Sequence, residues 1–313
     1  MPERGTAKAP ADRASARLFA FAAGLVVALV AGFGLGRVIG PVGTSTDSGA
    51  NAMNGMAGMT GSAQPSAGHT HGTTVTAGDQ VGGLAIAAGG YTLVPESTAL
   101  RAGGPQPFRF RIDGPDRKPV TTFAIAHDKP MHVIVVRRDL SGYQHLHPTM
   151  AADGTWIVQL GLPDTGPWRV FADFVVAGPA GVQTAATLGV DLTVAGQYQP
   201  HPLPAAARES TVDYYTVTYE GTPQVGATQP LLFRIFSSGR PVLGLDRYLG
   251  AYGHLVVLRE GDLGYVHVHP EDQLVGGAVK FWLAAPSPGR YRMFFDFQVN
   301  GQVHTAQYTM VVS

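Results

Sequence analysis

The 313-residue sequence contains no cysteine, and this absence excludes several kinds of site. Disulfides, thiolate-ligated zinc, iron–sulfur clusters, cysteine-ligated blue copper and cysteine nucleophiles all need the missing thiol. Charge is also scarce, at 14% of residues, and it is balanced between 22 basic and 22 acidic side chains. Because no net field would attract a polyanion, nucleic acid is not an expected partner. Any metal must be bound by His, Met, Asp or Glu.

The longest run without a charge lies near the N-terminus. Leu18 to Gly36 carries no charged residue and is close to the roughly 20 residues that cross a bilayer. We expect a single membrane anchor over residues 18–39, with a cleaved signal sequence as the alternative. Basic residues outnumber acidic ones in residues 1–17, which places that segment in the cytoplasm and the rest of the chain outside it.

Residues 40–78 have the Gly, Ser, Thr and Ala composition of a flexible tether. A solvated tether has no packing reason to carry methionine, yet this one holds five possible metal ligands: Met53, Met56, Met59, His69 and His71. Thioethers suit Cu(I), and imidazoles suit Cu(II) or Zn(II). The tether therefore predicts a copper-collecting arm, with an Ala/Gly-rich low-complexity linker as the alternative.

Beyond the tether, short apolar runs recur every 8 to 12 residues between Gly, Pro, Asp and Asn, without helical periodicity. This pattern is typical of an all-β fold, and we expect tandem immunoglobulin-like β-sandwiches. The first is predicted over residues 79–198 and the second over residues 211–313. A Pro/Ala-rich linker over residues 199–210 separates them.

The two predicted sandwiches are copies of each other. The stretch "MHVIVVRRDLSGYQHLHP" recurs 122 positions later as "GHLVVLREGDLGYVHVHP". The repeat carries two matching sets of histidines, which are His132, His145 and His147 in the first copy and His254, His267 and His269 in the second. Because a duplication copies accidents as well as sites, the second set is not independent support for a function.

The histidine spacing predicts one metal site in each sandwich. Strand residues two apart project to one face about 6.6 Å apart, so His145 and His147 form a natural ligand pair. A hairpin turn would set His132 opposite His147, so that three imidazoles converge on one Cu(II) or Zn(II) ion. His127, His201 and His304 have no counterpart in the other copy and are expected to be incidental.

A carboxylate follows in each copy, within "FADF" and "FFDF". Asp173 and Asp296 are candidate fourth ligands, or acceptors that fix the orientation of a ligand histidine. An ordinary ion pair between Asp173 and Arg169 is the alternative.

Over residues 91–313, and most clearly at "DKPMHVIVVRRDLSGYQHLHP" and "YLGAYGHLVVLREGDLGYVHVHP", the sequence resembles a family of bacterial secreted or membrane-anchored proteins. The resemblance implies an extracytoplasmic protein that handles copper or another heavy metal. The tether is similar to the Met/His-rich segments of periplasmic copper-resistance proteins.

Together these features predict a membrane-tethered protein that captures or buffers copper outside the cytoplasmic membrane. Cu(I) would bind in the tether and Cu(II) or Zn(II) in the sandwiches, with a membrane metal transporter as a possible partner. One alternative is an immunoglobulin-like interaction or envelope module with structural histidines. A zinc hydrolase or hydratase with a three-histidine site is a second alternative, but no general base or nucleophile pair accompanies the histidines, and we do not expect an enzyme.

Overall fold

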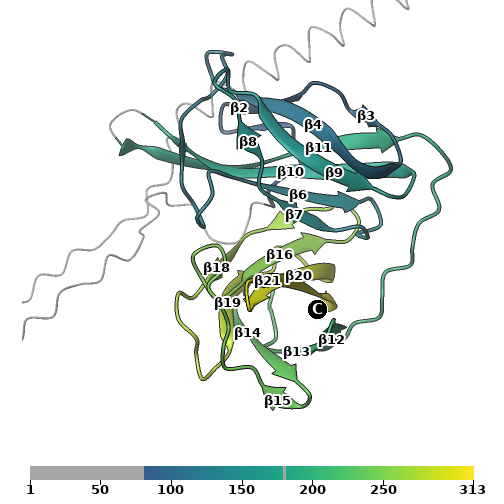
Figure 1. Cartoon of the computed structure of the whole chain (residues 1–313), viewed down its shortest axis with the longest axis vertical. Coiled ribbons are helices and arrows are strands. Elements are labelled where there is room, and N and C mark those ends of the chain that lie inside the picture. The colour runs from purple at the N-terminus through teal and green to yellow at the C-terminus, as the bar shows by residue number, and fades with distance from the viewer. Residues whose placement is uncertain (1–80, 179–180) are drawn as a thin grey trace, which may run out of the picture. The chain divides into compact units, whose positions relative to one another are not determined.

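The computed structural model describes residues 81–178 and 181–313 (Figure 1). The predicted membrane segment and the tether, with Met53, Met56, Met59, His69 and His71, lie outside these residues. Within the described part of the chain, no helix is long and apolar enough to cross a membrane.

The first sandwich consists of two sheets. Its strands are β1 (Ala87–Ala88), β2 (Tyr91–Pro95), β3 (Ala99–Leu100), β4 (Gly103–Asp113), β5 (Phe123–Ala124), β6 (Met131–Arg137), β7 (Gln144–Leu146), β8 (Thr149–Met150), β9 (Trp156–Leu162), β10 (Gly166–Ala177) and β11 (Gln183–Val194). One sheet has the order β1-β2-β4-β9-β8, and the other has β3-β11-β10-β6-β7 with β5 paired to β10. Phe108, Trp156 and Trp168 fill the core between them and are almost fully buried.

The second sandwich repeats this plan. Its strands are β12 (Glu209–Val212), β13 (Tyr215–Glu220), β14 (Thr228–Ser237), β15 (Arg240–Pro241), β16 (His254–Arg259), β17 (Tyr265–Val266), β18 (Val268–Pro270), β19 (Val279–Ala284), β20 (Gly289–Val299) and β21 (Gln302–Val312). The sheets have the orders β12-β13-β14-β19-β18, with β15 paired to β14, and β17-β16-β20-β21. Phe233, Phe281 and Phe295 lie in the core. The predicted all-β, tandem immunoglobulin-like fold is confirmed.

Strands β6 and β16 are buried on both faces, which explains why their sequences read as unbroken apolar runs. One face of each strand belongs to its own sandwich core, and the other belongs to a third apolar cluster that the two sandwiches build jointly. We call this the shared cluster. It consists of Ile134, Val136, Leu140 and Phe171 from the first sandwich and Val256, Leu258, Leu263, Tyr265 and Phe294 from the second.

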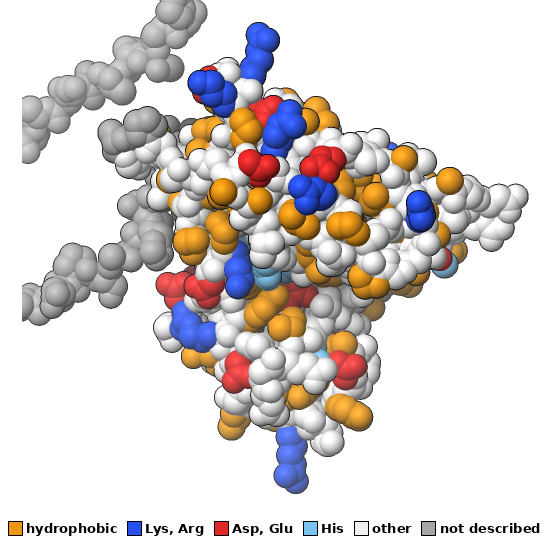
Figure 2. All heavy atoms as spheres, turned by 45° about the horizontal axis from the view of Figure 1, so that its top comes forward, with side chains coloured by type: hydrophobic (Ala, Val, Ile, Leu, Met, Phe, Trp, Pro, Cys, Tyr) orange, Lys and Arg blue, Asp and Glu red, His pale blue; other side chains and the backbone are white. Residues whose placement is uncertain are grey.

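The outer surface matches the balanced composition. On the face shown in Figure 2, basic and acidic side chains are interspersed among apolar ones. This pattern agrees with the sequence-based expectation that no extended field of one sign is present.

Candidate metal centre

Alternation along β6 decides which way its histidine points. Val133 and Val135 pack in the first sandwich's own core, whereas Ile134 and Val136 pack in the shared cluster. His132 lies an even number of residues from Ile134, so it shares the face that looks toward the second sandwich. It is 2% exposed.

The hairpin that follows β6 brings the HxH pair onto the same face. Strands β6 and β7 pair with Val133 opposite Leu146 and Ile134 opposite His145, and continuing this register sets His132 opposite His147, as predicted. In the turn, Gly142 has a φ of +64°, and a Cβ there would lie 2.5 Å from the ring of Trp168. Glycine therefore permits the close turn that fixes the register.

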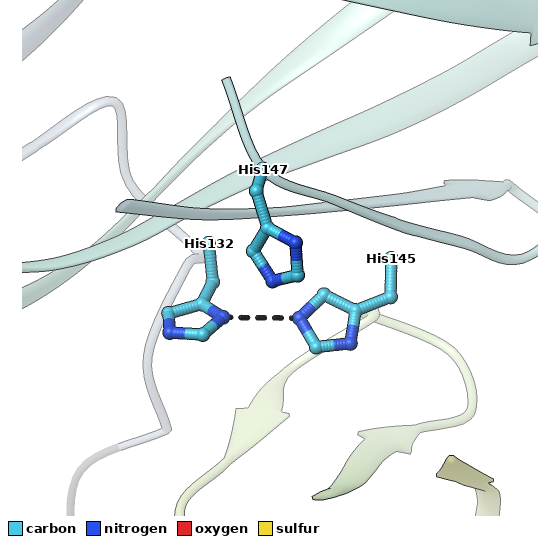
Figure 3. Close-up of side chains that lie close together, drawn as sticks. All are labelled: His132, His145 and His147. Atoms are coloured by element: carbon cyan, nitrogen blue, oxygen red, sulfur yellow. Dashed lines mark hydrogen bonds between the residues drawn. The ribbon is translucent and has the colours of Figure 1, made fainter. Parts of the chain in front are cut away.

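The three histidines of the first set converge (Figure 3). Nδ1 of His132 lies 3.0 Å from Nε2 of His145. The ring of His147 has its centroid 5.1 Å from that of His132 and 4.9 Å from that of His145. Each of the three offers one nitrogen within 4.8 Å of the others. Two imidazole nitrogens on one tetrahedral ion at about 2.05 Å would be about 3.3 Å apart, so small side-chain adjustments would admit an ion.

The second sandwich contributes two further groups to the same place. His254, at the start of β16, has its ring centroid 5.5 Å from that of His132 at an interplanar angle of 10°. The centroid of His254 lies 4.5 Å from that of His145. Asp296, on β20, accepts a hydrogen bond from Nδ1 of His145 at 2.8 Å. His145, His254 and Asp296 form a second group whose possible ligand atoms lie within 4.8 Å of one another. We refer to His132, His145, His147 and His254 as the four-histidine cluster.

Asp296 is held on all sides. Its Oδ1 accepts a hydrogen bond from Thr305 at 2.6 Å, and Tyr143 donates to its Oδ2 at 3.2 Å. The ring of Tyr143 stacks on that of Phe294 with centroids 4.0 Å apart. A carboxylate fixed in this way orients His145 and determines which of its nitrogens carries hydrogen.

The outer contacts of His132 and His145 direct their lone pairs inward. Nε2 of His132 lies 3.0 Å from the carbonyl oxygen of Ala126, which can only accept a hydrogen bond. Nδ1 of His145 faces the carboxylate of Asp296. If both histidines are neutral and the carboxylate is ionised, the inner nitrogens both carry lone pairs, and these face each other at 3.0 Å. The contact therefore needs a cation, which is either one extra proton or a metal ion.

Burial favours the neutral form of three of the four histidines. Desolvation and the neighbouring His145 lower the pKa of His132 to about 4 and that of His147 to about 3, and the same causes lower the pKa of His254 well below its usual range. Nε2 of His147 and Nδ1 of His254 are buried and have no hydrogen-bond partner. Neutral imidazole is the form that binds a metal, and a buried ring nitrogen without a partner is costly in a folded protein.

The low pKa values predict that metal-free protein loses stability in mild acid. Unfolded histidines take up protons near pH 6.5, whereas folded His132 and His147 do so only near pH 4 and pH 3, so the unfolded state binds more protons between these values. For each unit that the pH falls within this window, the free energy of unfolding should fall by up to about 1.4 kcal/mol through His132, and by less through the half-buried His147. Urea titrations at pH 7 and pH 5 measure the difference in the free energy of unfolding between the two pH values. An equal difference in the His132→Gln protein and in the unaltered protein would contradict this prediction.

The second predicted site is not assembled in the structure. Strand β17 leaves its partner β16 after Val266, and the chain then crosses to the opposite sheet, where His269 lies opposite Trp282 on β19. His267 and His269 are exposed, with ring centroids 4.7 Å apart. Among the described residues, the groups of three that could hold a metal place His254 with His145 and Asp296 instead. The structure therefore does not bring His254 together with His267 and His269, because the earlier crossing carries these two histidines to the opposite sheet.

The two predicted carboxylates occupy equivalent positions in the repeat but make different contacts. Asp173 lies opposite His132 in the β6–β10 ladder, as Asp296 lies opposite His254. Asp173 accepts a hydrogen bond from Thr187 at 2.6 Å, but it is absent from the described groups that could hold a metal. Arg169 does not pair with Asp173; it binds Asp191 and the carbonyl oxygen of Gly83.

His127, which the sequence predicts to be incidental, lies beside the cluster in the structure. Its ring centroid lies 6.1 Å from that of His132 and 5.8 Å from that of His254. His127 and Asp128 both have positive φ, at 48° and 60°, in a tight turn closed by hydrogen bonds between Ala126 and Lys129. Non-glycine residues rarely adopt this conformation, and it is visible only in the structure, so no sequence signal marked His127 as part of the cluster.

Fold and site together define a class: a tandem immunoglobulin-like protein in which both copies contribute to one buried histidine cluster. The chain belongs to a family described as a domain of unknown function, DUF8832, whose model matches residues 86–192 and 210–313. No curated protein matches the chain.

Three similar solved structures share less than 20% sequence identity with this chain. The Escherichia coli adhesin FdeC is 17% identical, with 73% of this chain and 66% of that one covered and a TM-score of 0.25. The Ig1-2 module of the Drosophila receptor protein tyrosine phosphatase DLAR is 12% identical, with 71% and 98% covered and a TM-score of 0.20. The D0-D1 domain of intimin is 12% identical, with 70% and 97% covered and a TM-score of 0.20. At these TM-scores the likeness carries no argument about function.

Proposed function

We propose that the protein binds one Cu(II) or Zn(II) ion per chain in the four-histidine cluster and serves to capture or buffer that ion. The observation that carries the proposal is the 3.0 Å distance between Nδ1 of His132 and Nε2 of His145, whose other ring nitrogens both face hydrogen-bond acceptors. The buried, unpartnered Nε2 of His147 would supply a third ligand, and His254, which groups with His145, would supply a fourth after a side-chain adjustment. Several neutral imidazoles without thiolate suit these two ions and are a poor match for Ca(II) or Mg(II).

The location and supply of the ion are part of the same proposal. An extracytoplasmic position, a Cu(I)-binding Met/His tether and exchange with a membrane transporter follow from the sequence analysis. Asp296 would hold His145 in position and is not required as a ligand, since its Oδ2 already accepts the bond from Nδ1.

Competition titration of the full chain with Zn(II) against a chromophoric chelator tests the proposal. We expect one tightly bound equivalent, lost in the His147→Ala protein. Failure of Zn(II) and of Cu(II) to compete with the chelator would overturn the proposal.

A role as an interaction module is the second candidate. Immunoglobulin-like sandwiches are common in cell-surface proteins, and Tyr214 and Leu243 are 88% and 86% exposed in the second sandwich. A pull-down with the Tyr214→Ser, Leu243→Ser protein as the control tests this role. A specific partner that binds the unaltered protein but not the double variant would support this role. If both proteins bind the same set of partners, the result would count against it.

A further inference from the structure

The two sandwiches meet through strand faces that carry a histidine at one end and apolar side chains along the rest. Ile134 and Val136 continue the face of β6 that carries His132, and Val256 and Leu258 continue the face of β16 that carries His254. The apolar members pack together in the shared cluster, and the rings of the two histidines stack beside it. The histidine cluster is therefore the polar end of the contact between the sandwiches.

The candidate ligands are divided between the sandwiches. His132, His145 and His147 come from the first, while His254 and the orienting carboxylate of Asp296 come from the second. The side chains of His145 and Asp296 are 3% and 2% exposed. Because they belong to different sandwiches, their hydrogen bond exists only when the sandwiches are docked. Separation of the sandwiches would remove one ligand and the group that positions another.

We propose that the bound ion locks the two sandwiches together, an inference that rests on the metal site proposed above. A ligand that binds one state of an equilibrium favours that state by a factor of 1 + [L]/Kd, which is about 100-fold when the ion is present at 100 times its Kd. Metal loading would thus hold the docked form, and loss of the ion would loosen it and expose the shared cluster. By reciprocity, a weakened apolar contact lowers the affinity for the ion.

The duplication explains how such a lock could arise. Beside β17 of the second copy the contact is made differently: Gly82 pairs with Tyr265, the counterpart of Tyr143, and the carbonyl oxygen of Gly83 accepts a hydrogen bond from Arg169 of the first sandwich. Backbone groups of Gly82 and Gly83 contribute to the contact at this place, whereas histidine side chains contribute to it at the four-histidine cluster. Only one side of the contact would therefore respond to a metal ion.

The absence of cysteine makes the proposal straightforward to test. Exposed positions in the outer sheets, Gln159→Cys on β9 and Arg240→Cys on β15, would carry two spin labels in the full chain without other reactive thiols. Phe294→Ala is added because it removes the ring stacked on Tyr143 and makes docking depend more on the histidines. If Phe294→Ala does not fold, Leu263→Ala trims the shared cluster from a loop instead.

We expect a broad distance distribution in chelator and a single narrow one with Zn(II), which is diamagnetic. His254→Ala should abolish the narrowing, and His269→Ala should preserve it. Stoichiometric Zn(II) binding with the same distribution in chelator and in Zn(II) would overturn the lock while leaving the metal site intact. Absence of Zn(II) binding in the unlabelled chain would overturn the metal site itself, so the two failures are distinguishable.

Discussion

Replacement of His254 by alanine is expected to weaken Zn(II) binding by more than about 100-fold, although His254 belongs to the other copy from the three-histidine set. Its Nδ1 is buried without a partner, and its ring lies 4.5 Å from that of His145. Loss of an outer partner alone typically costs 10–100-fold in affinity, and loss of a direct ligand should cost more. A factor of 100 corresponds to about 2.7 kcal/mol.

His269→Ala is the matched control for this experiment. His269 is related by the repeat to His147, but it is exposed and lies opposite Trp282 in a different sheet. Competition titrations should therefore show unchanged tight binding in His269→Ala and severe loss in both His147→Ala and His254→Ala. Loss of a bound equivalent in His269→Ala would restore the arrangement of one site per sandwich, and retention of tight binding in His254→Ala would contradict the shared site.

Asp296→Asn is expected to lower the affinity for Zn(II) by about 10–100-fold, with the fold preserved. The amide keeps the size of the side chain, so Thr305 and Tyr143 can still contact it. It cannot accept the bond from His145 with the strength of a carboxylate, and Nε2 of His145 becomes a weaker ligand.

Asp173→Asn serves as the control, since Asp173 occupies the equivalent position in the repeat. Asp173 contacts Thr187 and is absent from the described metal-binding groups. Affinities from competition titration, with melting temperatures to monitor folding, separate the two variants. Equal effects of both substitutions on affinity would show that Asp296 has no particular role in orienting His145.

Much of the fold could be predicted from the sequence because its signals are local. Regularly spaced apolar runs indicated the strands, and the 122-residue repeat indicated two sandwiches. The hairpin turn before Gly142 fixed the register that brings His132 and His147 together, because register depends on residues close in sequence. Three of the four histidines in the cluster could therefore be grouped without a structure.

The fourth histidine depends on contacts between sandwiches, which local patterns do not specify. Two residues, Ile134 and Val256, nevertheless carried a usable signal: each is apolar and lies on the same strand face as a histidine. An isolated sandwich would expose that face, so its apolar character indicates a covering partner. The departure of His267 and His269 could not be predicted, because β17 and β7 have similar sequences and differ in where the chain crosses between sheets.

The most direct measurement is the position of the ion in a crystal of Zn(II)-loaded protein, located by anomalous scattering at the zinc edge. We predict one strong peak bonded to Nδ1 of His132 and Nε2 of His145, with His147 and His254 completing the coordination at about 2.0–2.1 Å. A peak bound only by His267 and His269, or no peak in protein that has bound Zn(II) in solution, would contradict the shared site.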